Sequence, residues 1–223
     1  MATGRESEAE ASPPPLPDYY ATVAEDILAF CGRGGREVWM DLGSGAGGVG
    51  LALAERVPDG TMVLMDPNAE ALAKALGVAE RRGLASRVVP VVGSAEKMPL
   101  PDACIDVVVS RGSFYFWQDR TQGLREVGRV LRPGGRAMIG GGLGTGYPAW
   151  ARTEFIRRQR ESQRSKGAEA MRKFSEARNP ETFRRLATDA NLPNFEVVGE
   201  GGMDPDDPRS GVGIWLKFRK ESF

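Results

Sequence analysis

Residues 38–57, VWMDLGSGAGGVGLALAERV, decide the fold of this chain. They begin with an apolar run that ends near Asp41, continue through a burst of glycines, and finish in a helix-like pattern. A glycine-rich turn between a strand and a helix binds nucleotide-like ligands, because it lets the backbone approach them closely. Gly43, Gly45 and Gly48 match the spacing of a dinucleotide site, but phosphate and sulfonium ligands use similar turns, so the glycines alone leave the ligand open.

Strand-like and helix-like patterns alternate along the chain on both sides of this stretch. β-Branched runs predict strands at residues 37–42, 61–66, 87–93, 104–110 and 136–142, and helical periodicity predicts helices at residues 19–30, 48–57, 68–83 and 120–131. Residues 194–201 and 211–220 are joined by too short a segment for a crossover helix, so they should pair antiparallel. The sequence therefore predicts a doubly wound, Rossmann-like α/β fold with a mostly parallel seven-stranded sheet and an antiparallel C-terminal hairpin.

Length and charge limit the class of protein. The 223 residues, 41% of them hydrophobic, suit one domain at residues 18–223, preceded by a Pro-rich, acidic tail at residues 1–17 that is expected to be disordered. Thirty basic and 30 acidic residues cancel, which argues against a nucleic-acid partner or a membrane surface. No apolar run approaches the roughly 18 residues of a membrane span, so a cytoplasmic location is expected. The sequence leaves the oligomeric state open.

The chain contains no histidine, which excludes Ser-His-Asp and Cys-His catalysis as well as histidine zinc sites. Its two cysteines, Cys31 and Cys104, lie among apolar neighbours and outside any metal-binding spacing, so both are interpreted as reduced structural thiols. The acids near the strand ends are too scattered to cage a hard cation. We therefore expect no metal site.

The charge of the predicted turn bears on its ligand. Asp41 stands two residues before the first glycine, where a carboxylate would repel a pyrophosphate but attract an ammonium or a sulfonium group. At a partly dry site this attraction is worth about 4 kcal/mol at 4 Å. Asp66, at the end of the next predicted strand, is placed to accept hydrogen bonds from both hydroxyls of a ribose. Asp66 therefore indicates a nucleoside, without choosing between a dinucleotide and an adenosyl group.

Four segments in order resemble one family. Residues 41–47 (DLGSGAG) resemble motif I of the class I S-adenosylmethionine-dependent methyltransferases, and residues 93–101, 106–110 and 131–135 resemble three later segments of that family. The resemblance runs from about residue 19 to residue 142. It is closest to the small-molecule branch typified by the ubiquinone and menaquinone biosynthesis C-methyltransferases. It implies S-adenosyl-L-methionine as the cofactor and methyl transfer to a small-molecule acceptor.

The resemblance, together with the charge argument, gives a set of expected cofactor-binding residues at the ends of the predicted strands. These are Tyr20, Asp41, Gly43, Ser44, Gly45, Gly47, Asp66, Pro67, Ser94, Ala95, Glu96, Ser110 and Arg111. Ser94 stands where the family commonly carries Asp, so its hydrogen bond to the adenine amino group should lack charge assistance and be weaker. Residues 131–135 are expected to form a helix stop and a tight turn without a chemical role.

The methyl acceptor is expected just beyond the strand at residues 104–110. The aromatic run FYFW at residues 114–117 follows that strand, and one or two of its rings should wall the acceptor pocket. Arg111 either binds an anionic group of the substrate or pairs with a neighbouring acid. Where the acceptor needs deprotonation, the catalytic candidates are Tyr115, Asp119 and Arg111, with Glu96, Tyr19 and Tyr20 as further possible bases. An anionic acceptor would need none.

Two further segments are expected to cover the site. The helix that starts near Tyr19 should close over the cofactor, and residues 148–190, rich in arginine, should form a helical insertion over the acceptor. The apolar anchors of this insertion would be Trp150, Phe155, Ile156, Met171 and Phe174. The alternative is a solvated helix face without a role.

Two other functions were weighed against methyl transfer. An oxidoreductase of the short-chain type is disfavoured, because no tyrosine has a lysine four residues later. A relative that binds the cofactor without transferring methyl, such as a cyclase or a binding protein, stays open. The formation of S-adenosylhomocysteine would separate it from a methyltransferase.

Overall fold

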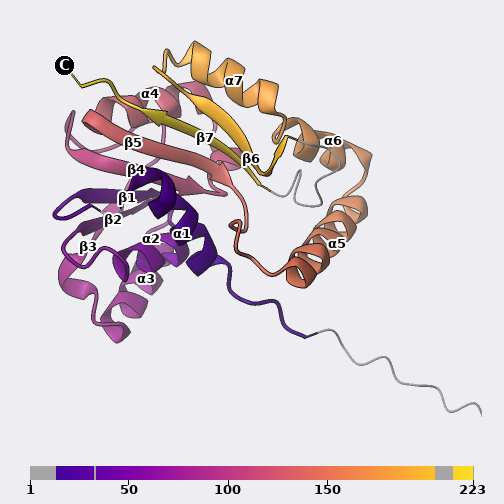
Figure 1. The fold of residues 1–223 in the computed structure, drawn as a ribbon, viewed down its shortest axis with the longest axis horizontal. Coiled ribbons are helices and arrows are strands. Elements are labelled where there is room, and N and C mark those ends of the chain that lie inside the picture. Colours follow the sequence, from indigo (N-terminus) through magenta and orange to yellow (C-terminus); the bar gives the residue numbers. More distant parts are fainter. Residues whose placement is uncertain (1–13, 33, 204–212, 223) are drawn as a thin grey trace, which may run out of the picture.

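The computed structural model describes residues 14–32, 34–203 and 213–222. One seven-stranded sheet runs through the molecule (Figure 1). Its strands are β1 (Val38–Leu42), β2 (Thr61–Asp66), β3 (Val88–Val92), β4 (Ile105–Arg111), β5 (Leu131–Gly141), β6 (Glu196–Met203) and β7 (Ile214–Arg219). Their order is β3-β2-β1-β4-β5-β7-β6, with the first five strands parallel and β7 antiparallel to both β5 and β6. The predicted fold class is confirmed.

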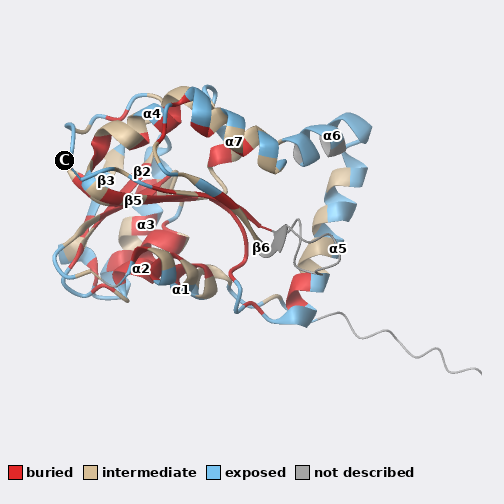
Figure 2. Cartoon of the chain, turned by 45° about the horizontal axis from the view of Figure 1, so that its top comes forward, coloured by how far each residue is buried: buried red, intermediate tan, exposed pale blue. Residues whose placement is uncertain are grey.

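Helices cover both faces of this sheet. They are α1 (Tyr20–Cys31), α2 (Gly48–Ala54), α3 (Ala69–Arg81), α4 (Arg120–Val130), α5 (Ala149–Ser165), α6 (Ala168–Glu176) and α7 (Pro180–Asp189), with short 3-10 turns η1 (Ala85–Arg87) and η2 (Phe114–Phe116). One buried cluster gathers α1, α2 and α3 on one face, and a second gathers α4 and α7 on the other. Figure 2 shows the strands as a buried layer between these helices.

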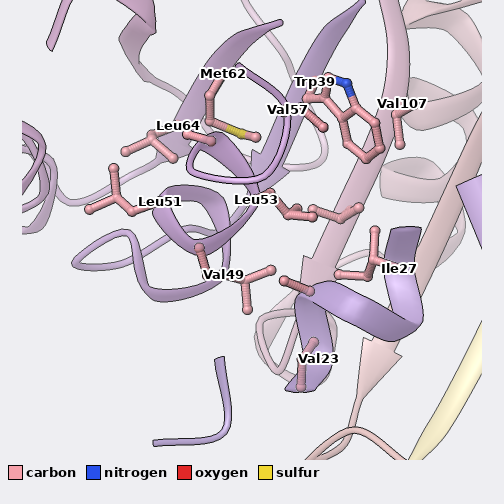
Figure 3. Close-up of a cluster of buried hydrophobic side chains, with 14 of the residues drawn as sticks. Val23, Ile27, Trp39, Val49, Leu51, Leu53, Val57, Met62, Leu64 and Val107 are labelled. Atoms are coloured by element: carbon pink, nitrogen blue, oxygen red, sulfur yellow. The ribbon is translucent and has the colours of Figure 1, made fainter. Parts of the chain in front are cut away.

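The central strand β1 explains why the sheet forms around the opening stretch. All but its first residue are buried, and the fully buried indole of Trp39 packs with Ile27 of α1 and Leu53 of α2 in one cluster (Figure 3). Burial of one large apolar side chain contributes about 1.5–3 kcal/mol. The apolar face of α1 therefore belongs to the core, and only its first turn is available to act as a lid.

The strand order places the carboxyl ends of three strands together. Strand β1 lies between β2 and β4, so the direction in which the sheet grows reverses between β1 and β4. Ligands of open α/β sheets bind outside the carboxyl ends of the strands at such a switch point. Asp41 and Asp66 lie at the ends of β1 and β2, and Arg111 ends β4.

Three segments differ from the sequence-based expectation. Strand β5 begins at Leu131, which pairs with Ile105, so the expected turn at residues 131–135 lies inside this strand. The pairing between β4 and β5 shifts its register between Ile105 and Val107. Residues 148–190 form three helices, of which α7 packs against α4, β6 and β7. The end of the expected tail is packed: Leu16 contacts an apolar cluster, and the Pro17 carbonyl accepts a hydrogen bond from the Tyr147 hydroxyl at 2.9 Å. Residues 1–13 lie outside the described residues.

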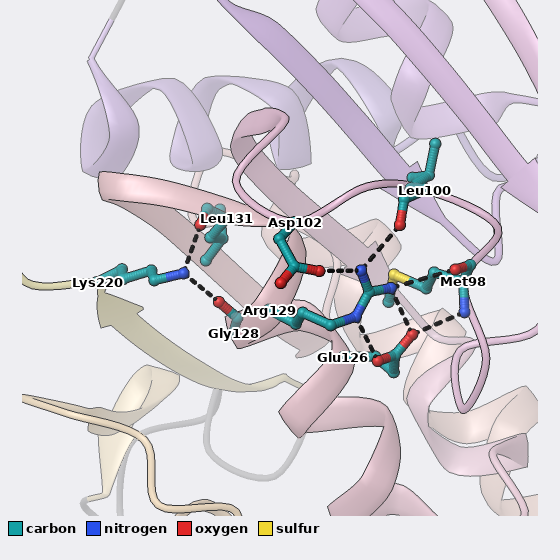
Figure 4. Close-up of polar contacts among 8 residues, drawn as sticks. All are labelled: Met98, Leu100, Asp102, Glu126, Gly128, Arg129, Leu131 and Lys220. Atoms are coloured by element: carbon teal, nitrogen blue, oxygen red, sulfur yellow. Dashed lines mark hydrogen bonds and ion pairs between the residues drawn. The ribbon is translucent and has the colours of Figure 1, made fainter.

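A polar cluster fixes the segment after β3 (Figure 4). The Arg129 guanidinium donates to the carbonyls of Met98 and Leu100 and to the carboxylates of Asp102 and Glu126. Glu126 in turn accepts from the Met98 N–H at 2.9 Å, and the hydrogen bond from Arg129 lowers the pKa of Glu126. Helix α4 therefore holds the loop that carries residues 94–96.

The buried Cys31 side chain is an unreactive thiol. Burial raises the pKa of the Cys31 thiol to about 12, so this cysteine stays protonated and inert. Both Cys31 and Cys104 are free thiols, as expected. No helix within the described ranges has the length and apolar character to cross a lipid bilayer.

Candidate functional site

Three glycines of the turn after β1 have positive φ angles, and two of them, Gly43 and Gly45, define its two sides. Gly43 has a φ of 72°, and a Cβ built on it would lie 2.2 Å from the Cβ of Ser113, so the chain cannot carry a side chain there. Gly45 has a φ of 54°, and a Cβ at this position would meet no atom within 4 Å. The turn therefore packs tightly against β4 on one side and opens into free space on the other.

Asp41 is buried and joined to the turn. Its Oδ2 accepts a hydrogen bond from the Gly50 N–H in α2 at 2.8 Å, and only 3% of the residue is exposed. Burial raises the pKa of the Asp41 carboxyl to about 7, and the negative charge of Asp66 adds to this, while the Gly50 N–H and Arg111 oppose it. Asp41 thus fixes the loop and also lines the cavity described next.

Asp66 bridges the turn and the next helix. Its Oδ2 accepts from the Gly45 N–H at 2.8 Å, and its Oδ1 accepts from the Asn68 N–H at the same distance. Asn68 caps α3 by accepting from the N–H groups of Glu70 and Ala71. The carboxylate of Asp66 is therefore held at the mouth of the turn with a fixed orientation.

Two cavities flank this turn. The loop cavity, of about 410 Å³, is lined by seven of the predicted cofactor residues: Tyr20, Asp41, Gly43, Ser44, Gly45, Gly47 and Arg111. The Ser44 hydroxyl is buried there and has no hydrogen-bond partner among the described residues. The ring of Tyr20 closes one side, because a Cβ on Gly48 would lie 2.4 Å from it. A buried hydroxyl without a partner needs an explanation, and a ligand bound at the turn would supply one.

The edge cavity, of about 640 Å³, lies on the other side of the turn. It is lined by Gly43 and by five further predicted residues, Asp66, Pro67, Ser94, Ala95 and Glu96. Glu96 is also structural, since its Oε1 accepts from the Gln118 N–H at 2.7 Å. Arg111 lines both cavities. The structure thus brings together all the predicted cofactor residues except Ser110, which is fully buried and lines neither cavity.

Ser113 is a residue of this region that sequence reasoning missed. Its hydroxyl donates to the Leu42 carbonyl at 2.8 Å, lies 2.6 Å from the Ser110 hydroxyl and accepts from the Trp117 indole at 3.2 Å. Ser113 therefore ties the ends of β1 and β4 together, and it lines the edge cavity beside Trp117. The only signal for it in the sequence is its place directly after a predicted strand.

A third and larger cavity, of about 940 Å³, lies between the sheet edge and helices α5, α6 and α7; we name it the basic cavity. Arg111 and Gly112 line it, so Arg111 is common to all three cavities. The Arg111 guanidinium donates to the Gly142 carbonyl at 3.0 Å and to the Tyr19 hydroxyl at 2.9 Å. These contacts hold Arg111 where the cavities meet.

The aromatic run after β4 is divided among three environments. Phe114 is fully buried in the core, whereas Tyr115 and Phe116 line the basic cavity, and Phe116 is 80% exposed. Trp117 lies in the edge cavity instead. Asp119 lines none of the three cavities, because its side chain caps α4 by accepting from the Gln122 N–H at 2.9 Å. Of the three predicted catalytic candidates, Tyr115 and Arg111 reach the basic cavity and Asp119 does not.

Helix α5 lines the basic cavity with one row of side chains. Phe155, Gln159 and Gln163, at successive spacings of four residues, line it. Arg157 and Arg158 do not, and both form ion pairs with Glu154 on the helix surface. Of the expected anchors, Phe155 and Ile156 pack against an apolar cluster and Trp150 is half exposed. The side chains of Met171 and Phe174 lie outside the described residues.

Metal ligands do not gather at any of these cavities. No group of three or more Asp, Glu or Cys side chains that could hold an ion is present among the residues that the structure describes. The absence of a metal from the chemistry stays a prediction.

The chain is similar to a known domain over 100 of its 223 residues. Residues 40–139 match the family model described as a methyltransferase domain. A 2-methyl-6-phytyl-1,4-hydroquinone methyltransferase of Arabidopsis thaliana is 32% identical over 117 residues, which are 52% of this chain and 32% of that protein. A ubiquinone/menaquinone biosynthesis C-methyltransferase of Xylella fastidiosa is 35% identical over 101 residues, 45% of this chain and 40% of that one. The chain spans about a third of the length of the first of these relatives.

A solved structure matches nearly the whole chain. It comes from Methanococcus maripaludis, is provisionally assigned as an S-adenosyl-L-methionine-dependent methyltransferase, and superposes with a TM-score of 0.73 at 26% identity. The match covers 92% of this chain and 86% of that one. It therefore extends well beyond the residues that the family model matches.

Proposed function

We propose that this chain is a class I S-adenosylmethionine-dependent methyltransferase and that it transfers a methyl group to a small acceptor held in the basic cavity. One observation carries the proposal. Arg111 lines the loop cavity, the edge cavity and the basic cavity at once, so a ligand around the glycine turn and a ligand in the basic cavity would meet at this residue.

The residues present fit the cofactor of that family. Asp66 offers a fixed carboxylate for the two ribose hydroxyls, and the unpartnered Ser44 hydroxyl and the open side of Gly45 would face the amino-acid portion. Asp41 supplies a negative charge for the ammonium group when ionised. Asp41, when ionised, favours a cationic ligand over a pyrophosphate, whereas Asp66 indicates a nucleoside without choosing between the two.

The adenine ring would lie in the edge cavity. Ser94 and Glu96 offer polar atoms there, and Trp117 and Phe116 offer aromatic surface. The Arg129 cluster holds this loop, so the adenine contacts are set before binding. Preorganisation of this kind lowers the entropic cost of binding a flexible ligand.

Methyl transfer needs alignment more than acid–base chemistry. The bound cofactor supplies a methyl group on a sulfonium sulfur, and an electron pair of the acceptor forms the new bond while the carbon–sulfur bond breaks and its electron pair stays on sulfur. The chain's task is to hold the acceptor in line with that bond, and such positioning can contribute roughly 7–11 kcal/mol. The walls formed by Tyr115, Phe155 and the Tyr19–Arg111 pair would provide it.

A base is required only if the acceptor carries a proton. The hydroxyls of Tyr19 and Tyr115 are then the candidates at the basic cavity, since Asp119 caps α4 and Glu96 lies on the cofactor side. Among these two, Tyr115 is flanked by guanidinium groups, with the Arg178 Cζ 4.2 Å from its ring centroid.

The test is product formation. The full chain is incubated with S-adenosylmethionine, EDTA and a panel of small acceptors, and S-adenosylhomocysteine and a mass gain of one methyl are measured together. We expect both to appear in equal amounts and to survive EDTA. Binding of S-adenosylhomocysteine without any methylated product would instead support the cyclase-like or binding-protein alternative, and a loss restored by Mg²⁺ would contradict metal-independent transfer.

A further inference from the structure

Charge is distributed unevenly over this molecule. The chain carries equal numbers of basic and acidic residues, yet the basic cavity is lined by a single carboxylate, that of Glu176, and by six cations. These are Arg111, Arg120, Lys166, Lys173, Arg178 and Arg185. The edge cavity shows the reverse balance, with Asp66 and Glu96 against Arg111 alone. A concave site with one sign of charge concentrates ligands of the opposite sign.

The charges at the rim are partly compensated. Lys173 pairs with Glu169 and Glu176 pairs with Arg172, both at 2.8 Å on the exposed surface of α6. Solvent screens exposed pairs of this kind, so the charges of Lys173 and Glu176 contribute little to the binding of a ligand deeper in the cavity. The inner cations are therefore the ones that select a ligand.

Three half-buried arginines form the inner part of the cavity, and each lies near an aromatic ring. The guanidinium carbon of Arg178 lies 4.2 Å from the Tyr115 ring centroid, that of Arg120 5.5 Å from Phe114, and that of Arg111 4.0 Å from Tyr19. Stacking of a guanidinium on a ring leaves its edge N–H groups directed sideways, where they can bind an anion in a fork.

The inner arginines are costly to place together. Burial lowers the pKa of both Arg120 and Arg178, and the charge of Arg111 lowers the pKa of Arg178 further. Neither Arg111 nor Arg120 forms an ion pair with any described residue. Among these residues, Arg120 donates one hydrogen bond, to the Tyr115 carbonyl at 3.1 Å. A ligand with negative charge would offset this cost.

We propose that the methyl acceptor is a small anion whose carboxylate or phosphate binds the guanidinium groups of Arg120 and Arg178. The inference rests on the proposed function and names the class of its acceptor. Tyr19, Leu143 and Phe155 supply an apolar wall for the rest of the molecule. A neutral, lipid-like acceptor would fill this wall but leave Arg120 without an ion-pair partner among the described residues. A nucleic acid is disfavoured, because the positive charge lines a cavity of about 940 Å³.

Calorimetry on the full chain saturated with S-adenosylhomocysteine tests the inference. Benzoate and phenyl phosphate are the anionic probes, and benzamide is the neutral match for benzoate. We expect benzoate to bind at least tenfold more tightly than benzamide. Arg120→Gln and Arg178→Gln should each weaken both anions by roughly tenfold, as for a lost hydrogen bond to a charged group, and leave benzamide unchanged. Arg178→Lys should fall between, because it keeps the charge without the fork.

The matched control is Arg158→Gln. Arg158 lies on α5 and pairs with Glu154 at 2.6 Å outside the cavity, so this variant should bind every probe as the unmodified chain does. Equal binding of benzamide and benzoate, or no binding of either anion, would overturn the anionic acceptor while S-adenosylhomocysteine still binds. Failure of the unmodified chain to bind S-adenosylhomocysteine would overturn the proposed function itself. Thermal unfolding of each variant checks that it is folded.

Discussion

The cofactor side and the acceptor side of this molecule are built in different ways. Most of the predicted cofactor residues of the loop and edge cavities lie at or just after the ends of β1, β2 and β3, and the acids Asp41 and Asp66 are fixed by backbone N–H groups. The basic cavity draws on residues from Tyr19 to Arg185, and its inner charges are arginines held on aromatic rings. The first is a local motif, and the second exists only after folding.

This difference matches the charges that each side is proposed to bind. Carboxylates surround the turn where a sulfonium and an ammonium would lie, and guanidinium groups surround the space where the acceptor would lie. Arg111 lines all three cavities, so the acidic cofactor side and the basic acceptor side meet at this residue. A change on one side should therefore alter binding of one ligand and leave binding of the other almost unchanged. The predictions below test that separation.

The largest effect should come from Gly45→Val. A β-branched residue at a φ of 54° is strained, and its side chain would project into the open side of the turn. We expect S-adenosylhomocysteine to bind roughly 100-fold more weakly by calorimetry, which corresponds to about 3 kcal/mol. Binding of benzoate in the basic cavity should change less than twofold.

Gly83→Val is the matched control for that variant. Gly83 has a φ of 69° and also has no atom within 4 Å of a built Cβ, but it lines none of the three cavities. Its thermal stability should fall as much as that of Gly45→Val, because the backbone strain is alike, while cofactor affinity stays normal. A similar loss of affinity in both variants would show that strain, and not the site, is responsible.

Asp66→Ala should have the next largest effect. The carboxylate is proposed to accept both ribose hydroxyls, and bonds to a charged group contribute about 1.5–3 kcal/mol. We expect S-adenosylhomocysteine affinity to fall by roughly tenfold or somewhat more, but by less than in Gly45→Val. Asp59→Ala, which removes an exposed carboxylate just before β2 that lines none of the three cavities, is the control and should bind normally. Unchanged affinity in Asp66→Ala would refute the placement of the ribose.

The same contrast explains how much could be predicted from the sequence. The order of elements and the hairpin followed from periodicity, because buried strands read as apolar runs and β6 and β7 leave no room for a crossover. The residues of the glycine turn followed from a motif within ten residues of chain. Both depend on local patterns.

The acceptor side could not be read in the same way. Arg120 and Arg178 lie 58 positions apart by number, and only the packing of α4 and α7 brings them to one cavity. Ser110 was expected at the ligand but is buried behind Ser113, since side chains alternate along β4. Asp119 looked catalytic in sequence but caps α4. Tertiary contacts decide each of these roles.

The pH dependence of cofactor binding should depend on Asp41. Burial raises the pKa of its carboxyl to about 7, so the free, folded chain keeps a proton there that the unfolded chain loses near pH 4. Stability from this group is therefore present at acid pH and lost as the pH rises through 7. A cofactor that binds only the ionised carboxylate should gain up to about tenfold in affinity from pH 6 to pH 8.

Asp41→Asn isolates this effect. The amide oxygen can still accept from the Gly50 N–H, so the loop should keep its shape. The chain has no histidine, so no imidazole titrates in the same pH range. We expect the affinity of the variant for S-adenosylhomocysteine to be flat between pH 6 and pH 8 and its stability to lose the decline near pH 7. An unchanged pH profile would assign the titration to another group.

The smallest effect should come from the arginines of α5 that lie outside the basic cavity. Arg157 and Arg158 share Glu154 as a partner, and Arg157 also pairs with Glu161, so their charges are already compensated at the surface. Arg157→Gln with Arg158→Gln should change the acceptor KM by less than twofold at low salt, whereas Arg120→Gln should raise it by about tenfold. Kinetics at two salt concentrations measure both. A large, salt-sensitive rise in the double variant would place the selecting charges on the outer face of α5, and the separation between a cationic cavity and a neutral surface would then be wrong.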